Sequence, residues 1–500
     1  MEANRGAPTP PIEFDVAPAA VSTHLKARAI AVDTTVLERL RSTGASVGVD
    51  ESVLVESGRD WWPLAMSWAL DGQVPARPAC VVRPQTGAEV AAVLAVCNDS
   101  RVPVTPSAGR SGVCGAAVPV HGGVVLDLCG LEGLVAVDDE SLLIDVRPGT
   151  FGDVLEDELR ARHGLTLGHW PQSIALSTVG GWLACRSAGQ LSNRYGKIED
   201  MVAGLEVALA DGRVVRTGGH GPRASVGPDL TQLFVGSEGT LGVITEARLR
   251  VHPVPPAERR AAYGFATFAD GLDACRRIVR RGATPAVLRL YDDAESKRNF
   301  DVDDHHVLLV LDEGDDAVLD GVMRVVEEEC NGAARLDVAL VDRWMTHRND
   351  VSALQSLTRH GIVVDTIEIA ARWSALVPMY DAVTAAIRTT EHALAASAHQ
   401  SHAYTDGACL YFTFAGRPPP EEKDAFYVAA WDAATKAVLT HGGALSHHHG
   451  VGVNRARFVP RALGPAFHVL AEVKRALDPR GVLNPGKLGL PDPFGEVAWP

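Results

Sequence analysis

The stretch Pro106-Ser-Ala-Gly-Arg-Ser-Gly112 is the strongest single indication of the fold. It follows the β-like run Val102-Pro-Val-Thr105 directly and combines small residues with two hydroxyl groups. Such a composition lets backbone N–H groups converge on an anion, as in a phosphate-binding nest. The stretch is not GxGxxG and does not lead straight into a long apolar helix, which argues against a Rossmann dinucleotide fold. Taken alone, it is equally compatible with a glycine-rich loop that binds nothing.

Two further segments are rich in small residues. The first runs from Gln172 to Gly189 (QSIALSTVGGWLACRSAG) and the second from Gly236 to Ile244 (GSEGTLGVI). Either one could be a tight turn. However, three such segments lie between residues 106 and 244, and all can present N–H and hydroxyl donors. Together they indicate a large phosphorylated cofactor that is held in an extended conformation.

Composition excludes several classes of function. The 500 residues are 46% hydrophobic, which is ordinary for a globular protein, and the chain is too long for one core, so we expect two or three domains. The formal net charge is −15 and there is no Lys/Arg-rich block, so neither nucleic acid nor an anionic membrane is an expected partner. We see no secretory signal and no apolar run long enough to span a membrane. Eight scattered cysteines without a CxxC pair indicate a reduced, cytoplasmic protein.

The pattern of elements differs between the two halves of the chain. The first half alternates short strands (80–83, 124–128, 142–146) with helices (86–99, 154–161), and Thr86 is the expected N-cap of the first helix. A Pro-rich linker at His252-Pro-Val-Pro-Pro256 precedes the second half. There we expect strands at 307–312 and 410–414, a helix at 319–329, and long helices around 375–397 and 421–440. The turn-rich segment after residue 473 should dock on a preformed surface.

A set of sequence blocks in a fixed order extends over most of the chain. The blocks are PSAGRSG (106–112), QSIALSTVGGW (172–182), CRSAG (185–189), NRYGKIEDMV (193–202), GSEGTLGVITEA (236–247), RLYDD (289–293), DGACLYFTF (406–414), SHHHGVG (446–452) and LDPRGVLNPGKL (477–488). From Pro78 to Leu488 the chain resembles the FAD-binding PCMH-type flavoproteins of the vanillyl-alcohol oxidase superfamily. Among these it is most similar to the alkyldihydroxyacetone-phosphate synthase (alkylglycerone-phosphate synthase) branch.

The resemblance implies an α+β fold with four parts. Residues 1–75 would form an N-terminal arm and lead-in, and residues 76–255 a PCMH-type FAD-binding domain. Residues 256–455 would form an α+β cap that holds the substrate, and residues 456–500 would return to the FAD domain. The cofactor implied is FAD. Some relatives attach the flavin covalently to His or Cys, but Ser107 and Arg110 cannot form such a bond, so we expect noncovalent FAD. Cys114, the one nearby nucleophile, should be a packed small residue.

The resemblance also implies which residues bind the cofactor. Residues 106–112 would hold the pyrophosphate, 172–178 and 185–188 would line the flavin and adenosine channel, and 238–244 would close over the flavin. The expected cofactor-binding residues are Pro106, Ser107, Ala108, Gly109, Arg110, Ser111, Gly112, Gln172, Ser173, Ser177, Thr178, Cys185, Arg186, Ser187, Ala188, Glu238, Gly239, Thr240, Leu241, Gly242, Val243 and Ile244.

Five residues match catalytic positions of the synthase branch: Arg289, Tyr411, His447, His448 and His449. Tyr411 lies among apolar neighbours on a predicted strand, where a phenol is either a positioned acid/base or a core aromatic. Arg289 is a permanent cation, suited to an anionic substrate group or to a reduced-flavin anion. Without the resemblance, a surface ion pair would be its simplest role.

Three consecutive histidines raise the question of a metal. Adjacent residues cannot all point into one site, and no second His/Glu pair stands at ligand spacing. The metal-using 2-hydroxy-acid dehydrogenases of the superfamily have a His-rich motif where this chain has residues 401–407, and a Glu-His pair where it has His448-His449. His402 alone does not rebuild that site, so we expect no metal. A solvated loop is the simplest alternative, but the flanking glycines favour a tight turn that delivers one imidazole inward.

One segment departs from the synthase branch. That branch carries an Arg that is thought to hold the substrate phosphate, whereas the segment 350–356 has Gln355 or a neighbour in its place. A neutral amide binds phosphate more weakly than a guanidinium. Arg348 or Arg359 could substitute from an adjacent turn.

Three functions therefore compete. The first is an FAD-dependent oxidoreductase that oxidises a small polar hydroxy (or amino) acid by hydride transfer to flavin N5. In it Arg289 would bind the carboxylate, and Tyr411 or a histidine of 447–449 would take the hydroxyl proton. The alternative is alkyldihydroxyacetone-phosphate synthase, which exchanges the acyl chain of acyl-dihydroxyacetone phosphate for a fatty alcohol through a flavin N5 adduct. The third is a flavin-binding protein without catalysis. We expect a small-molecule substrate and no stable membrane insertion. The sequence leaves open whether the chain forms a homodimer.

Overall fold

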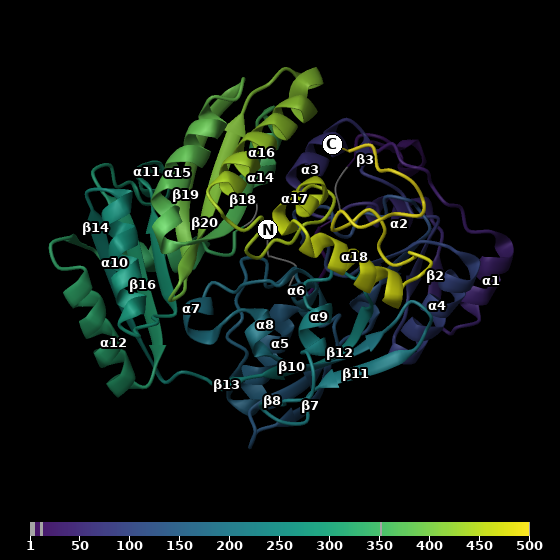
Figure 1. Cartoon of the computed structure of the whole chain (residues 1–500), viewed down its shortest axis with the longest axis horizontal. Coiled ribbons are helices and arrows are strands. Elements are labelled where there is room, and N and C mark those ends of the chain that lie inside the picture. The colour runs from purple at the N-terminus through teal and green to yellow at the C-terminus, as the bar shows by residue number, and fades with distance from the viewer. Residues whose placement is uncertain (1–5, 11–13, 351–352, 500) are drawn as a thin grey trace.

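The computed structural model describes residues 6–10, 14–350 and 353–499. Within these residues the chain builds two larger neighbouring sheets and two two-stranded sheets in its N-terminal half, and one large sheet in the cap (Figure 1). The cap, teal to green in Figure 1, stands beside the N-terminal sheets, and the yellow C-terminal helices lie against the purple N-terminal part. The first sheet has the order β2 (Ser46–Gly48), β4 (Cys80–Arg83), β6 (Val124–Asp127) and β5 (Val104–Ser107).

Parallel pairing in this first sheet positions the glycine-rich loop. Strands β4, β6 and β5 run parallel, and residues 108–112 follow the carboxyl end of β5. Ligands of parallel sheets bind at that edge. Helix α4 (Gly87–Ser100) covers the sheet, with the Thr86 side chain accepting from the Glu89 N–H as its N-cap, as predicted. Its apolar side joins the sheet residues in one core with Val90 and Leu94 fully buried.

The second sheet carries the other predicted cofactor segments. It has the order β11 (Val214–Gly218), β10 (Val202–Ala208), β12 (Val243–Arg250), β8 (Leu143–Val146) and β7 (Leu134–Asp138). The neighbouring helices are α5 (Gly152–Glu158), α6 (Val179–Cys185), α7 (Ser192–Tyr195), α8 (Ile198–Met201) and α9 (Leu230–Phe234). Helix α6 begins inside the QSIALSTVGGW block, and β12 begins where the GSEGTLGVI block ends, so both blocks flank this sheet.

The cap is built on one antiparallel sheet. Its strand order is β17 (Ala334–Leu336), β14 (Ala257–Phe265), β16 (His306–Gly314), β15 (Val287–Tyr291), β19 (Ala393–Ala403), β20 (Gly407–Gly416) and β18 (Val363–Arg372). Its helices are α10 (Phe268–Arg280), α11 (Asp293–Phe300), α12 (Asp316–Glu329), α13 (Ala339–His347), α14 (Ala353–Arg359), α15 (Trp373–Arg388) and α16 (Lys423–Thr440).

The two faces of the cap sheet are chemically different. Leu288 and Leu290 of β15 and Phe412 of β20 enter a core that they share with α10, α15 and α16. Because side chains alternate along a strand, Arg289 and Tyr411 must lie on the opposite face. That face is the one turned towards His448 and His449, whose rings lie beside Tyr411.

The helix predicted around 375–397 is too long. Helix α15 ends at Arg388, and Ala393–Ala403 is strand β19. The two elements are separated by a turn in which His392 adopts a left-handed conformation (φ 69°). The stretch 393–398 is rich in alanine, which favours a helix, but it pairs with β20 along one side, and β19 continues beyond it to pair with β15 at His399 and Gln400. Sheet pairing overrides the local propensity here.

The C-terminal segment returns to the FAD domain, as expected. Leu483 forms a β-bridge with Val104, and the Lys474 Nζ of α18 (Ala466–Leu477) donates to the backbone oxygens of Thr240 and Leu483 at 2.8 Å each. The N-terminal lead-in instead contacts the cap: the Trp62 indole of the segment before α3 (Pro63–Leu70) donates to the Tyr427 hydroxyl at 2.8 Å. The lead-in therefore joins both halves of the molecule.

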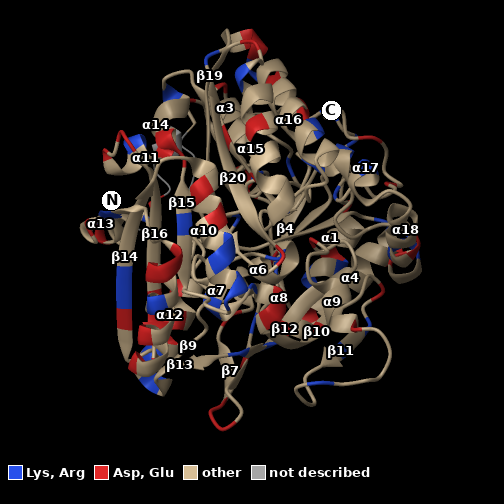
Figure 2. Cartoon of the chain, turned by 60° about the vertical axis from the view of Figure 1, so that its left-hand side comes forward, with Lys and Arg blue, Asp and Glu red and all other residues tan. Residues whose placement is uncertain are grey.

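The distribution of charge and the length of the helices bear on the expected partners. Basic and acidic residues are interspersed along the elements in Figure 2. In the described part of the chain, no helix is both long enough and apolar enough to cross a bilayer. All eight cysteines are free, and seven of them are buried.

The Lys474 contacts lead to a stability prediction. Replacing Lys474 with Met leaves Asp478, whose carboxylate lies 2.6 Å from Nζ, as a buried charge without its partner. We expect a loss of about 3–5 kcal/mol in the free energy of unfolding of the region it ties together. Chemical denaturation followed by tryptophan fluorescence measures this loss, with the exposed neighbour Arg475→Met as control. Equal stability of the two variants would contradict the prediction.

Candidate active site

The three predicted cofactor segments meet in the structure. A methyl group added at Gly239 would lie 2.8 Å from Pro106, and one at Gly109 would collide with the Leu176 carbonyl oxygen. The Glu238 N–H donates to the Ala184 carbonyl oxygen at 2.9 Å. Residues far apart in sequence thus form one continuous surface, in which glycine permits the close approach of the backbones.

Each of the three segments holds one non-glycine residue in the left-handed region. These residues are Arg110 (φ 56°), Arg186 (φ 57°) and Glu238 (φ 50°). The conformation costs about 1–3 kcal/mol per residue and persists where the surrounding structure demands it. Its repetition in the three segments is typical of a binding site.

The residues of the first segment fit a phosphate group. The Ser107 hydroxyl and the Arg110 Nε are buried, and neither has a hydrogen-bond partner. Buried polar groups are nearly always hydrogen-bonded, so these two donors point to a ligand. Both are suited to the oxygens of the FAD pyrophosphate, which the segment was expected to bind.

Other predicted cofactor residues shape the segments through contacts within the protein. The Thr178 side chain caps α6 by accepting from the Gly181 N–H, and the Ser177 hydroxyl accepts from the Trp182 indole at 2.7 Å. Arg186 donates to two backbone oxygens of the segment 232–235. The Gln172 side chain donates to the Asp350 carbonyl oxygen of the cap at 3.0 Å. We therefore infer that these side chains stabilise the conformation of the cofactor segments.

The cap sheet contributes a chain of polar contacts on its site-facing side. The Arg289 Nη2 lies 2.5 Å from the His399 Nε2, and the His399 Nδ1 lies 2.7 Å from the Glu295 carboxylate. Burial and the nearby Arg289 lower the pKa of His399 to about 4, so the imidazole is neutral at pH 7. A neutral ring fits the network if Nδ1 carries the proton and donates to Glu295. His399, which sequence reasoning missed, thereby orients Arg289.

The structure places the ring of Tyr411 outside the hydrophobic core of the cap, and its acid/base role stays a prediction. Its ring is half-buried and stacks on His399 with the centroids 4.9 Å apart, and it meets His449 edge-on at 5.4 Å. Leu410 and Phe412 fill the core on the opposite face. Tyr411 is therefore a residue of the site wall. Burial raises its pKa, so the phenol keeps its proton at neutral pH and can donate a hydrogen bond.

Glu368 on β18 holds the turn formed by residues 446–452, which carries His447, His448 and His449 and is called the histidine turn below. Its fully buried carboxylate accepts the backbone N–H groups of all three histidines, the Ser446 hydroxyl at 2.8 Å and the Arg455 guanidinium at 2.9 Å. Burial alone would raise the pKa of Glu368, but Arg455, His449 and the N–H donors outweigh it and hold the pKa below its usual range. The carboxylate is thus ionised. Sequence reasoning missed Glu368, whose signal was one acidic residue in the alternating strand 365–370.

The turn brings two imidazoles, and not one, towards His402. Ligand-capable atoms of His402, His447 and His448 all lie within 4.8 Å of one another. A β-bulge between Gln400 and His402 adds one residue to β19 and turns His402 to the site-facing side. Ser192 Oγ lies 2.6 Å from His402 Nδ1, and the Tyr404 hydroxyl 2.8 Å from His447 Nε2. The expectation that this site holds no metal stays a prediction.

Hydrogen bonds and close backbone packing join the histidine turn to the cofactor segments. A methyl group at Gly450 would collide with the Glu238 carboxylate and lie 3.1 Å from the Cys185 side chain. The Glu238 carboxylate accepts from the Val451 N–H at 2.6 Å, and the Lys197 Nζ donates to the His447 carbonyl oxygen at 2.6 Å. The predicted catalytic and cofactor residues therefore adjoin one another.

The segment expected to bind phosphate in the synthase branch is partly described. The side chain of Gln355 lies outside the described residues, and Arg359 is exposed. Arg348 lies 5.5 Å from the Trp170 ring and 5.6 Å from the Trp344 ring, and its buried Nη1 has no partner. Arg348 is thus the better placed of the two substitutes.

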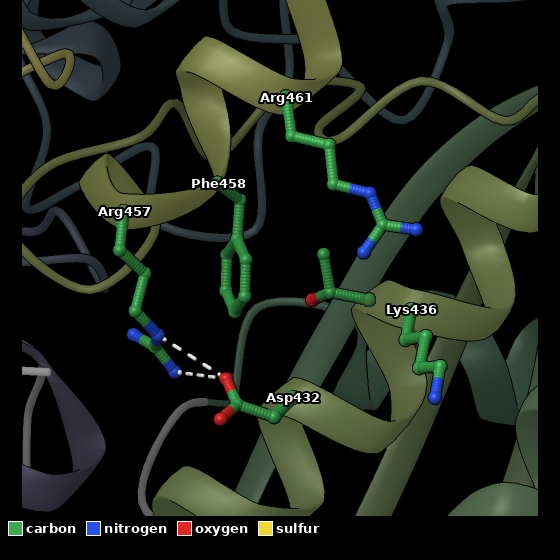
Figure 3. A pocket seen from close by; sticks show the side chains of 6 residues that line it. Asp432, Lys436, Arg457, Phe458 and Arg461 are labelled. Atoms are coloured by element: carbon green, nitrogen blue, oxygen red, sulfur yellow. Dashed lines mark hydrogen bonds and ion pairs between the residues drawn. The ribbon is translucent and has the colours of Figure 1, made fainter.

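A hollow of about 400 Å³ between helix α16 of the cap and the C-terminal segment lies apart from these residues (Figure 3). Asp432, Lys436, Arg457, Phe458 and Arg461 line it together with Thr435. Asp432 already pairs with Arg457 at 3.0 Å. None of the predicted cofactor or catalytic residues lines this hollow, so we assign it no role in the site.

The buried histidines make the fold sensitive to acid. Burial is the main cause that lowers the pKa of His399 and His449 to about 4 and that of His169 to about 3, and it lowers the values of His402, His447 and His448 as well. Unfolded histidine titrates near pH 6.5. Below that pH the unfolded chain therefore binds protons that the folded chain does not, so this contribution to stability is complete above pH 6.5 and falls towards pH 4.

We expect the melting temperature to be constant between pH 7 and 8 and to fall between pH 6.5 and 4.5. Each imidazole contributes up to about 1.4 kcal/mol per pH unit to that fall. Thermal unfolding followed by circular dichroism measures it. His449→Gln should flatten the pH dependence, whereas the exposed His468→Gln should leave it unchanged. An unchanged melting temperature at pH 5 in the wild type would refute the prediction.

Comparisons with known proteins agree with this geometry. Residues 78–218 match the family described as FAD binding domain, and residues 254–488 match FAD linked oxidases, C-terminal domain. The chain is 31% identical over 435 residues to the uncharacterized FAD-linked oxidoreductase YgcU of Escherichia coli K12, covering 82% of this chain and 89% of that protein.

Similarity extends to alkyldihydroxyacetonephosphate synthase and to glycolate oxidase. The Dictyostelium discoideum synthase is 30% identical over 457 residues, covering 83% of this chain and 74% of that protein. A solved alkyldihydroxyacetonephosphate synthase structure superposes with a TM-score of 0.76 at 25% identity, covering 96% of this chain and 89% of that one. The glycolate oxidase subunit GlcD of Bacillus subtilis is 28% identical over 446 residues, covering 85% of this chain and 92% of that protein.

These findings confirm the expected α+β fold, the FAD cofactor and the enzyme class. The chain therefore belongs to the FAD-linked oxidase family, as an enzyme of the FAD-dependent oxidoreductase type.

Proposed function

We propose that this enzyme oxidises a small polar hydroxy acid with noncovalent FAD. The observation that carries the proposal is that the positive charge of Arg289 has no carboxylate partner among the described residues. Among the described residues no carboxylate lies within ion-pair distance of its guanidinium, and its buried Nε has no hydrogen-bond partner. Its Nη2 contacts the neutral His399, and its guanidinium lies 5.5 Å from the Tyr291 ring and 6.0 Å from the Trp344 ring, none of which carries a negative charge. A substrate carboxylate would supply the missing counter-charge.

The neighbouring residues could handle the hydroxyl group of such a substrate. FAD, when bound, supplies a two-electron acceptor. His449 is the best-placed proton acceptor because its Nδ1 is buried without a hydrogen-bond partner and lies 3.6 Å from the ionised Glu368. The Glu368 charge would stabilise the imidazolium that forms on proton uptake. Tyr411, which stays protonated, would donate a hydrogen bond that orients the substrate oxygen.

Two further observations support parts of this proposal. Cys114, the nucleophile nearest to the glycine-rich loop, is buried, and burial raises the pKa of its thiol, so a covalent flavin bond at that position is not favoured. The free state of all eight cysteines supports a reducing, cytoplasmic location.

The second candidate is the alkyldihydroxyacetone-phosphate synthase reaction, in which a fatty alcohol replaces the acyl chain. It is favoured by the similarity to the synthases and by Arg348, a buried guanidinium with a free donor atom. Arg348 could bind a phosphate in place of the Arg of the synthase branch. We rank it second because Arg289 alone accounts for a carboxylate substrate.

Anaerobic absorbance titration separates the two candidates. The purified flavoprotein is titrated with D- and L-2-hydroxy acids and, separately, with palmitoyl-dihydroxyacetone phosphate. Bleaching of the flavin band by a hydroxy acid, with electrons passed to an added dye, would establish the oxidoreductase. Bleaching by the acyl phosphate alone, with no electrons reaching the dye, would overturn it in favour of the synthase.

The role of Glu368 can be tested by Glu368→Gln. The amide keeps the size of the side chain but offers one oxygen to donors that the carboxylate now satisfies with two. We expect turnover with the best substrate to fall at least about 100-fold, because the variant loses both the geometry of the turn and the stabilising charge.

The control is Glu313→Gln, which changes a cap-sheet carboxylate that binds the Tyr195 hydroxyl and contacts none of the site histidines. Flavin content is measured by absorbance in each variant. Unchanged turnover per flavin in Glu368→Gln would show that the carboxylate has no part in catalysis.

A further inference from the structure

We propose that Arg59, in the lead-in that precedes both matched family segments, is a second guanidinium for the FAD pyrophosphate, beside Arg110. The inference rests on FAD as the cofactor and is independent of which substrate is oxidised. It assigns a binding role to residues between the N-terminal arm and residue 75, which the sequence indicated only as a small packed lead-in.

Arg59 is a buried cation with free donor atoms. It is 1% exposed and follows helix α2 (Glu51–Glu56). Its Nη2 donates to the Glu56 carboxylate at 2.5 Å and to the Pro10 carbonyl oxygen at 2.8 Å, whereas Nε and Nη1 have no hydrogen-bond partner. A buried guanidinium usually satisfies all of its N–H groups, so the two free atoms indicate a missing anionic partner.

Arg110 shares the same carboxylate. Its Nη2 lies 3.2 Å from the Glu56 oxygen that Arg59 also contacts, and its own Nε is buried without a partner. Two guanidinium groups thus face one carboxylate. The adjacent Asp60 does not restore neutrality at low pH, because burial raises its pKa to about 7. The cluster carries an excess of positive charge that a pyrophosphate would neutralise.

The backbone places this cluster against the glycine-rich loop. The Trp61 N–H donates to the Gly112 carbonyl oxygen at 2.8 Å, and the Thr9 N–H donates to the Gly109 carbonyl oxygen at 2.9 Å. The lead-in and the arm therefore contact the loop at two points. The hydroxyls of Thr9 and Ser107 are also buried without partners. Four residues therefore have unpaired hydrogen-bond donors at or beside the glycine-rich loop, which already fits phosphate. They are Thr9, Arg59, Ser107 and Arg110.

Asp60 is the other buried carboxylate beside the cluster. Asp60 Oδ1 accepts from the Trp62 N–H at 3.1 Å, and its Oδ2 has no hydrogen-bond partner. Protonated, Asp60 would add one more donor, and ionised it would oppose an anion.

The decisive measurement is the affinity of the deflavinated full-length chain for FAD, FMN and riboflavin, followed by flavin fluorescence. We expect Arg59→Met to weaken FAD binding about 10- to 100-fold, the effect of losing hydrogen bonds to a charged group. Riboflavin, which has no phosphate, should bind within twofold of its wild-type affinity.

Arg83→Met is the matched control. Arg83 ends strand β4 near the same sheet edge, is half exposed and lies 3.7 Å from Asp127. It should leave the affinity for FAD unchanged. Equal weakening of FAD and riboflavin by Arg59→Met would show a general structural role and overturn the proposal, as would an FAD affinity within twofold of the wild type.

If Arg59→Met does not fold, the proposal is tested with Arg59→Lys in a competition assay. Inorganic pyrophosphate should compete with FAD for the wild-type apoprotein, and more weakly for Arg59→Lys, because an ammonium cannot offer the paired donors of a guanidinium. Equal competition in the two proteins would also overturn the proposal.

Discussion

The buried carboxylate of Glu368 is the interaction on which the candidate active site depends. It gathers the N–H groups of three consecutive histidines, which would otherwise be unsatisfied in a turn, and it pairs with the buried Arg455. An ionised group is costly to bury and is tolerated only when donors surround it. The same donors fix the directions of the imidazoles, so stability of the turn and geometry of the site have one cause.

A second buried carboxylate, Glu238, likewise accepts backbone N–H groups, and these bonds connect the two halves of the molecule. It belongs to a cofactor segment, has a left-handed backbone, and accepts the N–H groups of Val451 and Gly452 from the histidine turn. The cofactor surface and the cap are thus joined by the residues that also line the site. Occupancy of the cofactor site and the position of the catalytic residues should therefore be coupled.

Several parts of the site could be predicted from sequence because they are local. Glycine-rich segments reveal a backbone that must approach a ligand closely, and Thr86 reveals the start of a helix. The residues that were missed, such as His399, Glu368 and Arg59, are single polar residues in otherwise ordinary segments. Their meaning comes from partners more than 40 residues away, as in the contact between Arg59 and Arg110 through Glu56.

The sequence by itself determined the α+β class and, through the family resemblance, the FAD cofactor, whereas Arg289 and Tyr411 stay predicted site residues. Only the tertiary structure decided which face of the cap sheet these residues occupy, how far helix α15 extends, and that a bulge turns His402 towards the histidine turn. The physical reason is that strand pairing is non-local. An alanine-rich stretch becomes a strand when a neighbouring strand, here β20, offers it ladder hydrogen bonds, and one inserted residue reverses the face of each residue after it.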